Sequence, residues 1–476
     1  MLSRIIHSSF FGRITYAFSA NIVVFIASML ATFLIPKLLG GNIEQYGFYQ
    51  LYIFYAGFIG FFHLGLCDGI YLREGGKQYA KLDKKVQSSQ FWLLSVFETL
   101  VSCSILIIAL QSSGNVDNKI VFAVIALSLF IYLPRTFLVY ILQATNRIKE
   151  YSFIVVLGRS AFLLLLLIAF FIKDLSFRYF VYCELLCQSI ELCVSVVICN
   201  DIVFTKPVPI KEGLYEAFEN IKIGINLLAA NIASLLITGI VRFGIQQKWD
   251  IATFGIVSFS LSVSNLVLVL INAVALVLYP SLRTLDPDRL RGLYPKIRNC
   301  LMIPMMGFLL FYYPFVLVLQ AWLPQYSESF QYLSILFPLC IFSSKMNMLV
   351  LTYLKVYRKE RTILKANILG IVVSLVSTTI SVVVFGNILM AIISILVNQI
   401  VCCVYAENVL AKQIKINVRK DNILEVCATC CFILCHWFFY GVIATVLYLC
   451  VYLIYLFLKR KDLSGIRLIN SSNGFK

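Results

Sequence analysis

Two short motifs occur twice in this chain, and their repetition decides the fold. The chain reads SANI at positions 19–22 and NIEQYG at 42–47, and later AANI at 229–232 and DIATFG at 250–255. Each pair of motifs opens a long apolar stretch, and the two copies are offset by about 210 positions. Internal duplication of a helical unit is typical of membrane transporters. The repeat therefore predicts one membrane-embedded unit that is present twice.

The composition places the chain in a membrane. Of its 476 residues, 61% are hydrophobic and only 13% are charged, and a soluble globule cannot cover that much apolar surface. The formal net charge of +17 would by itself permit binding to nucleic acid. The basic residues lie in short clusters between apolar segments, however, and not along one polar face, so we expect no nucleic-acid partner.

Fourteen apolar segments follow one another along the chain. A helix needs ~20 apolar residues to span the hydrocarbon core, and polar or glycine-rich breaks separate stretches of about that length. We therefore predict an all-α polytopic membrane protein of about 14 transmembrane helices, with two pseudo-symmetric six-helix lobes and a C-terminal helix pair. The predicted segments are 14–37, 46–70, 90–111, 119–142, 152–172, 178–200, 222–245, 251–280, 300–323, 332–354, 363–385, 387–409, 422–437 and 440–458.

The basic residues also predict the orientation. With the N-terminus in the cytoplasm, 31 of the 40 lysines and arginines fall on the cytoplasmic side, 5 on the outer side and 4 within membrane segments. Lysine and arginine collect in the cytoplasmic loops of membrane proteins. We therefore expect an even number of helices with both termini in the cytoplasm.

The longest internal loop predicts the boundary between the two lobes. It carries Leu214, Ala217, Phe218 and Ile221 on one helical face, as in an amphipathic helix that lies on the inner membrane surface. The predicted domains are an N-lobe at 1–200, a cytoplasmic amphipathic linker at 201–221, a C-lobe at 222–409, and C-terminal helices with a tail at 410–476.

The sequence offers little support for a metal site or for a nucleotide-binding site. Nearly all of the 15 cysteines fall in apolar segments, where cysteine acts as a small hydrophobic residue. Cys427 and Cys430 form a C-x-x-C spacing, but only His436 lies nearby and no second cysteine pair accompanies them, which disfavours a metal site. The chain has no Walker A motif, so direct ATP hydrolysis is not expected. We expect no cofactor and no metal, and coupling to a proton or a sodium gradient stays open.

Four basic residues lie where charge is costly. Arg135, Arg159, Arg242 and Lys345 fall inside predicted membrane helices, where a charge costs at least ~2.5 kcal/mol on insertion scales. Arg135 and Lys345 obey the repeat, because they are 210 positions apart. Cations that face one central cavity would form a site for an anionic substrate.

The alternative is that each of these cations belongs to a structural ion pair, because buried charges generally need partners. Glu98, His63 and Glu191 lie at depths comparable with those of the two arginines of the first lobe. Lys345 has no acidic residue at mid-depth in its own or either adjacent predicted helix, which favours a substrate contact at that position.

The inner end of the second segment carries a further cluster. Residues 65–76 place glycines beside Asp68 and Arg73. Glycine allows the backbone to approach a lipid headgroup or to bend during gating. A flexible helix end with a solvated charge pair explains the same pattern at least as well.

Tyrosines recur along the same predicted helix at positions 46, 49, 52 and 55. Such a stripe is suited to stacking against a sugar. A helix interface or a belt at the membrane surface is the favoured interpretation.

In their order along the chain, these features resemble a known family. The opening apolar helix, the turn at 44–47, the segment from Gly65 to Arg73 and the repeated turn at Phe254 and Gly255 are similar to the O-antigen type of polysaccharide flippase. Those proteins belong to the multidrug/oligosaccharidyl-lipid/polysaccharide exporter superfamily. The similarity spans nearly the whole chain and rests on the order and duplication of these motifs.

This resemblance implies a function and partners. It implies a flippase of the bacterial plasma membrane that moves an undecaprenyl-pyrophosphate-linked oligosaccharide to the outer leaflet by alternating access, for O-antigen and lipopolysaccharide biosynthesis. The partners would be the lipid bilayer and, beyond the substrate, a polysaccharide polymerase and a chain-length regulator. The first helix lacks an arginine, which favours a polysaccharide unit over the peptidoglycan precursor lipid II. The resemblance implies Arg135, Arg242 and Lys345 as the anion contacts, and Asn21 and Asn231 as equivalent polar positions on the first helix of each lobe. From the residues alone, Arg159 is a further candidate for substrate binding, and Asp68 and Arg73 are candidates for a gating or headgroup position.

Two other functions compete with this interpretation. A multidrug exporter of the same superfamily would be expected to expose carboxylates that hold cationic drugs, whereas the intramembrane charges noted here are mostly basic. A membrane-embedded polymerase or glycosyltransferase would be expected to carry a large external loop. No predicted outer loop is longer than about a dozen residues, so we do not expect an enzyme.

Overall fold

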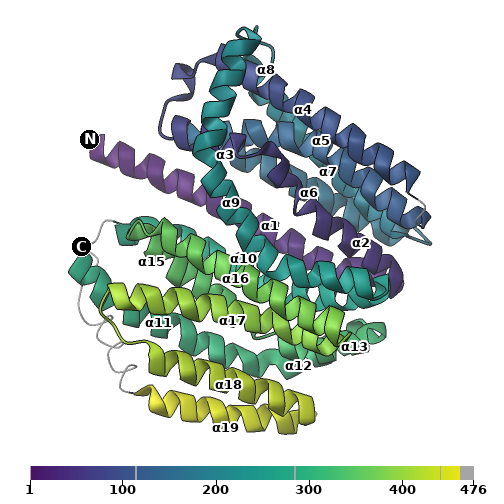
Figure 1. The fold of residues 1–476 in the computed structure, drawn as a ribbon, viewed down its shortest axis with the longest axis vertical. Coiled ribbons are helices and arrows are strands. Elements are labelled where there is room, and N and C mark those ends of the chain that lie inside the picture. Colours follow the sequence, from purple (N-terminus) through teal and green to yellow (C-terminus); the bar gives the residue numbers. More distant parts are fainter. Residues whose placement is uncertain (1, 113–114, 284–285, 440, 461–476) are drawn as a thin grey trace. The chain divides into compact units, whose positions relative to one another are not determined.

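The computed structural model describes residues 2–112, 115–283, 286–439 and 441–460 (Figure 1). It is 88% helical and contains no strand within those ranges. Twelve of the described helices are long and apolar enough to cross a membrane, or thirteen when the bent pair α2–η1 and α3 counts as one span. The helix α19 is a shorter apolar helix of 17 residues. The prediction of an all-α polytopic membrane protein is thereby confirmed.

The chain divides into two compact units, residues 1–232 and 233–476, and each described part is a helical bundle. In the first unit, α5 packs against α4, α7 and α3, while α6 packs against α1 and α7. Apolar side chains from α3, α4, α5, α6 and α8 form its core near the loop ends of these helices. Its elements are α1 (Leu2–Leu38), α2 (Ile43–Ala56), η1 (Ile59–His63), α3 (Leu66–Glu74), η2 (Tyr79–Lys81), α4 (Lys84–Gln111), α5 (Val116–Ala144), α6 (Ile148–Ile168), η3 (Ala169–Phe171), α7 (Phe177–Ile198), α8 (Asn200–Val203) and the first part of α9 (Ile210–Lys248).

In the second unit, α10 packs against α13 and α14, α16 packs against α17, and α18 packs against α19. Two short π-helical segments, η6 and η7, interrupt otherwise regular helices. Its elements after α9 are α10 (Ile251–Arg283), α11 (Pro287–Phe308), η4 (Leu309–Phe311), α12 (Tyr312–Trp322), η5 (Pro324–Tyr326), α13 (Ser327–Leu336), α14 (Leu339–Ser344), η6 (Lys345–Val350), α15 (Leu351–Val356), α16 (Glu360–Thr378), η7 (Thr379–Val384), α17 (Ile388–Gln413), α18 (Arg419–Phe438) and α19 (Val442–Leu458).

The sequence repeat is also a repeat of helices. The two copies open with the helices α1 and α9, of 37 and 39 residues. The next helix begins in the same way in both copies, since Asn42 accepts a hydrogen bond from the Gln45 backbone N–H and Asp250 accepts one from that of Thr253. A side-chain oxygen at the N-cap satisfies a backbone donor that the helix itself leaves unpaired. Hydrogen bonding from Thr253 lowers the pKa of the Asp250 carboxyl.

The predicted linker differs from the structure in one respect. Residues 210–248 form one continuous helix, α9, and not a surface helix followed by a separate membrane helix. No proline interrupts this stretch, so nothing in the backbone forces the helix to end. Leu214 and Phe218 are exposed, as expected of the apolar face of the predicted linker, whereas Ala217 is buried. The tail at 461–476 lies outside the described residues.

Glycines bring α3 and α9 into backbone contact within the first unit. A Cβ atom on Gly69 would lie 1.9 Å from the Asn220 carbonyl oxygen, and one on Gly224 would lie 2.0 Å from that of Gly65. Gly65 also has a φ of 89°, in the left-handed region that other residues rarely adopt. Gly65 and Gly69 of the 65–76 cluster are therefore needed for a close helix crossing.

Candidate functional site

The first unit holds an ion pair between α5 and α7. An Arg135 guanidinium nitrogen lies 2.9 Å from a Glu191 carboxylate oxygen, and the two side chains are only 12% and 10% exposed. Gly158 on α6 leaves room for this carboxylate, because a Cβ atom there would lie 1.8 Å from Glu191 Oε1. Of the two uses that the sequence left open for Arg135, the structure shows the ion pair.

Arg159 on α6 is the more accessible of the two arginines in this unit. Its guanidinium lies 3.6 Å from the Glu184 carboxylate on α7, and its side chain is 41% exposed. A loose pair with a half-exposed arginine can exchange its partner for a substrate group more readily than a tight buried pair can.

A layer of tyrosines from α2 lies beside these charges. Tyr46, Tyr49 and Tyr52 are buried. The Tyr52 hydroxyl is 3.1 Å from the Ser128 hydroxyl on α5, and Gln188 on α7 donates to it at 3.4 Å. The tyrosine stripe is therefore part of a helix interface, and its buried members do not offer open faces to a sugar.

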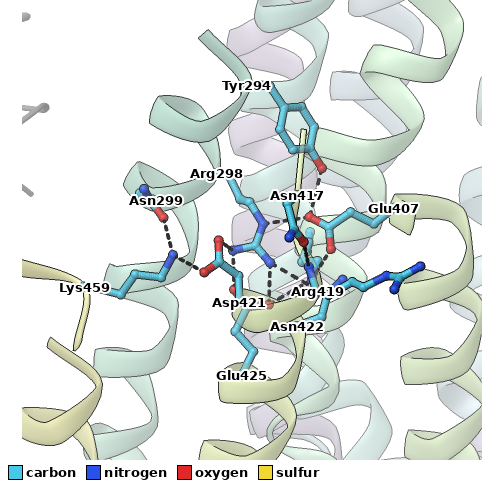
Figure 2. A network of polar contacts seen from close by, with 11 residues as sticks. Tyr294, Arg298, Asn299, Glu407, Asn417, Arg419, Asp421, Asn422, Glu425 and Lys459 are labelled. Carbon is cyan, nitrogen blue, oxygen red and sulfur yellow. Dashed lines mark hydrogen bonds and ion pairs between the residues drawn. The ribbon is translucent and has the colours of Figure 1, made fainter. Parts of the chain in front are cut away.

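The second unit contains a larger network whose centre is buried (Figure 2). Lys345, the first residue of η6, is 0% exposed, and its ammonium lies 2.6 Å from Glu407 on α17 and 2.8 Å from Glu425 on α18. It also donates to the side-chain oxygen of Asn422. Arg298 on α11 is 1% exposed and contacts the same two glutamates at 2.7 and 2.6 Å.

This network extends to the last helix of the described chain. Asp421 lies 2.7 Å from the ammonium of Lys459, which follows α19, and Lys459 in turn donates to Asn299 at 3.2 Å. The Tyr294 hydroxyl donates to Glu407 at 2.9 Å. Three cations, Arg298, Lys345 and Lys459, thus face the three carboxylates Glu407, Asp421 and Glu425. The network joins α11, η6, α17, α18 and the end of α19.

Lys345 has two acidic partners, although none lies in its own or either adjacent predicted helix. The bundle brings Glu407 and Glu425 to the lysine from helices much later in the chain. Arg298 lies just before the predicted segment 300–323, whereas the observed helix α11 begins at Pro287 and buries this side chain. The signal that would have revealed the network is the presence of two glutamates inside the last apolar segments.

The other predicted positions lie apart from these networks. Arg242 donates to the Ser258 hydroxyl at 3.0 Å and lies over the ring of Phe254. Asn21 on α1 is partly buried, whereas Asn231 on α9 is exposed, so the two asparagines do not have the same environment.

The two predicted gating residues are separated by their environments. Asp68 is buried, with His63 Nε2 at 3.8 Å from its Oδ2 atom. Arg73 is partly exposed and contacts Glu216 at 3.0 Å and Asn220 at 2.9 Å, both on α9. Asp68 and Arg73 therefore have separate partners, His63 for the first and α9 side chains for the second.

The ion pairs in the two units limit which cations can bind a substrate. Arg135 and Lys345, the two cations related by the repeat, are each neutralised by carboxylates of their own unit. Among the described residues, no group of three or more His, Cys, Asp or Glu side chains is placed to hold a metal ion. Arg159 is the predicted cation with the most open side chain among those whose ion pairs are given above.

Solved structures of other proteins share the fold of this chain. No family model matches the sequence, and no curated protein matches it. The chain is similar to an inward-facing multidrug resistance MATE family transporter of the MOP superfamily, with a TM-score of 0.58 and 15% identity over 83% of this chain and 98% of that one. An outward-facing transporter of the same description matches with a TM-score of 0.50 and 14% identity over 83% and 96% of the two chains. A MATE in complex with MaD3S matches with a TM-score of 0.53 and 15% identity over 85% and 96%.

Proposed function

We propose that this protein, which has the fold of the MATE transporters, is a secondary transporter that works by alternating access. The observation that carries the proposal is the fold itself, because chains of this fold have been solved facing inward and facing outward. The absence of a Walker A motif fits transport that is driven by an ion gradient and not by ATP. The protein would then be a multi-pass transporter of the bacterial plasma membrane with both termini in the cytoplasm.

For the substrate, export of small amphipathic compounds has the better support. Two of the solved chains named above are described as multidrug resistance transporters. The charge pattern agrees with this class, since Arg135 and Lys345 are neutralised within their units and do not offer an excess of positive charge. Glu184 supplies a carboxylate beside a partly exposed position, which is the kind of group that attracts a cationic compound.

The second candidate is translocation of an undecaprenyl-pyrophosphate-linked oligosaccharide. Two observations favour it: the order of motifs along the sequence and the half-exposed Arg159, whose guanidinium is suited to a phosphate oxygen. In this case a polysaccharide polymerase and a chain-length regulator would act with the protein. Arg159 and Arg242 would then be the substrate contacts, because Lys345 is closed off by its partners.

One pair of assays separates these substrate classes. The chain is expressed in an efflux-deficient bacterium, where we expect faster export of ethidium. It is also expressed in a strain that lacks its own O-antigen flippase, where restored surface polysaccharide would support the second candidate instead. Arg159→Ala should abolish polysaccharide restoration if that arginine binds pyrophosphate, whereas Arg178→Ala, an exposed pair with Asp117, is the matched control. Activity in neither assay would contradict both substrate classes.

A further inference from the structure

A pocket lies in the second unit where α17 ends and α18 begins, outside the charge network described above. Its volume is about 570 Å³, within the range of about 300–1,000 Å³ that small-molecule sites occupy. Lys412 on α17 and Arg419 on α18 line it with exposed basic side chains. Asn408 and Asn417 add two amides to the lining. The pocket is therefore polar, and it opens to the surface of the unit.

The pocket carries an excess of positive charge. Residues 408–420 contain four basic residues and no aspartate or glutamate. The carboxylates on either side of this segment, Glu407 and Asp421, are already held in the buried network. Lys412 and Arg419 take part in none of the ion pairs found among the described residues. Figure 2 shows the Arg419 side chain extending away from the network.

Backbone hydrogen bonds fix the loop that carries the pocket. The Ile416 N–H donates to the Ala411 carbonyl at 2.9 Å, across Lys415, whose φ is 55°. A left-handed residue followed by such a bond is a common way to end a helix. Arg291 on α11 donates to the Lys415 carbonyl at 3.0 Å and thus ties the loop to a further helix. The pocket is therefore formed before any ligand binds.

The lining groups are suited to a phosphate. A guanidinium and an ammonium group both bind phosphate oxygens. The Asn417 side-chain oxygen accepts a hydrogen bond from the Arg419 backbone N–H at 3.1 Å, so its NH2 group is the part that can donate to a ligand. The distribution of basic residues predicts that this loop lies in the cytoplasm. Basic pockets between membrane helices on that side are typical sites for acidic lipid headgroups.

An exposed apolar stripe continues from the pocket along α18. It starts one turn after Arg419 and keeps a spacing of three or four residues, so its members share one face of the helix. The stripe consists of Ile423, Cys427, Cys430, Leu434 and Phe438, all of which are exposed. An acyl chain can lie along such a face while its headgroup occupies the pocket. A free phosphate ion would leave the stripe unused.

The loop at the equivalent position of the first unit has a different charge. Residues 198–210, which lie 210 positions before 408–420, carry only one basic residue, Lys206. They also contain Asp201, which pairs with Lys84 at 3.1 Å. The excess of positive charge is therefore a property of the second copy, in which the loop leads into α18.

We propose that this pocket binds the phosphate headgroup of an anionic phospholipid from the inner leaflet, with Lys412 and Arg419 as the anion contacts. The inference goes beyond the proposed function, because it concerns a lipid that stays in the membrane and not the transported compound. A bound headgroup would bridge the end of α17 and the start of α18. It would thus stabilise the entry of α18 into the buried network.

The test uses the full chain purified in detergent, with dioleoyl phosphatidylglycerol as the probe and dioleoyl phosphatidylcholine for comparison. Native mass spectrometry measures the bound lipid, and the melting temperature measures its effect on stability. Phosphatidylglycerol should bind and raise the melting temperature. Phosphatidylcholine, which has no net charge, should bind about tenfold more weakly or less. Equal binding of the two lipids would overturn the proposal.

A pair of double variants locates the site. Lys412→Gln with Arg419→Gln should weaken phosphatidylglycerol binding by about tenfold or more, because each basic residue near the surface contributes about fivefold. Lys359→Gln with Arg361→Gln is the matched control, since it removes the same charges from exposed positions between α15 and α16. The control should bind like wild type. Equal losses in the two double variants would show a general surface attraction and overturn the pocket.

Two further measurements keep the outcome clear. If the pocket double variant fails to fold, Lys412→Gln alone should still weaken binding by about fivefold, and unchanged binding would contradict the proposal. Glycerol 3-phosphate separates a lipid from a free phosphate. Stabilisation by this soluble compound at the same concentration as phosphatidylglycerol would overturn the lipid assignment. These measurements involve no transport, so their failure is distinct from a failure of the multidrug proposal.

Discussion

Both units hold a basic residue inside the helical bundle, and they neutralise its charge in different ways. In the first unit, Arg135 forms one ion pair with Glu191, and both side chains keep about a tenth of their surface exposed. In the second unit, the equivalent Lys345 lies among Glu407, Glu425 and Arg298 and has no exposed surface. In both units a cation on the fourth helix of the repeat meets a glutamate on the sixth.

The difference comes from α18 and α19, which have no counterpart in the first unit. Glu425 and Asp421 on α18, with Lys459 after α19, enclose the lysine and extend the pair into a network. A buried network with equal numbers of cations and carboxylates leaves no free charge for a substrate. We infer that the duplication provided the ion pair in each unit. In the second unit, α18 and α19 then extended this pair into a buried network that holds helices together.

The largest expected effect is on stability, when the buried network loses one charge. Lys345→Met should destabilise the protein by about 3–5 kcal/mol, because removing one partner of a buried pair leaves the other charge uncompensated. The melting temperature and the yield of monodisperse protein in detergent measure the effect. Lys355→Met, an exposed lysine at the end of α15, is the control. A Lys345→Met protein that melts like wild type but fails in transport would return the lysine to a substrate role.

Restoring neutrality should recover part of that loss. Lys345→Met combined with Glu425→Gln removes one charge of each sign, and we expect a coupling energy of about 0.5–3 kcal/mol in the double-mutant cycle. The cycle is measured by chemical or thermal unfolding of the four proteins. Strict additivity would show that the two side chains do not act as one network.

The equivalent change in the first unit should be milder. Arg135→Met should cost about 1–3 kcal/mol, because the Glu191 carboxylate that it leaves behind retains some contact with solvent. Melting temperatures of Arg135→Met and Lys345→Met, compared side by side, test the contrast between the units. Equal losses would mean that α18 and α19 do not make the second network special.

A single methyl group probes the fit of the first-unit pair. Gly158→Ala places a Cβ atom against the Glu191 carboxylate, and overpacking of this kind costs about 1–3 kcal/mol. The better helix propensity of alanine offsets ~1 kcal/mol of that cost. Gly60→Ala, which meets no atom within 4 Å, is the control. We expect a lower melting temperature for Gly158→Ala only.

The smallest effect should come from a pair outside the membrane helices. Burial alone would raise the pKa of Asp201, but hydrogen bonds from Tyr79 and Lys84 outweigh it and hold the pKa below its usual value. The contribution of Asp201 to stability is therefore present above its unfolded-state pKa and is lost as the pH falls through the folded-state pKa. Melting temperatures of wild type and Asp201→Asn should differ slightly at neutral pH and converge in acid. A difference that persists in acid would contradict this assignment.

Much of the fold could be predicted from residues close together in the chain. Each predicted apolar segment coincides with a described helix or with a helix broken by a short 3-10 or π segment. The motifs at 42–47 and 250–255 correctly mark the starts of α2 and α10, because Asn42 and Asp250 act as N-caps. The pairing of Arg135 with Lys345 as equivalent positions likewise follows from the repeat alone.

The site could be predicted only in part, because the packing of the helices decides which carboxylate meets each buried basic residue. Glu191 was a candidate partner for the arginines, and it does meet Arg135. Glu407 and Glu425 reach Lys345 from 62 and 80 positions later in the chain, a distance over which hydrophobic periodicity carries no information. Glu98, expected at the depth of the arginines, meets neither of them.

The sequence by itself determined that this chain is a duplicated bundle of membrane helices, because apolar length and repeated caps are local properties. The tertiary structure decided which charges are neutralised and which carboxyls are left without a partner. That decision depends on which helix faces turn toward one another, and in an apolar bundle the cost of an unpaired charge makes those few contacts decisive.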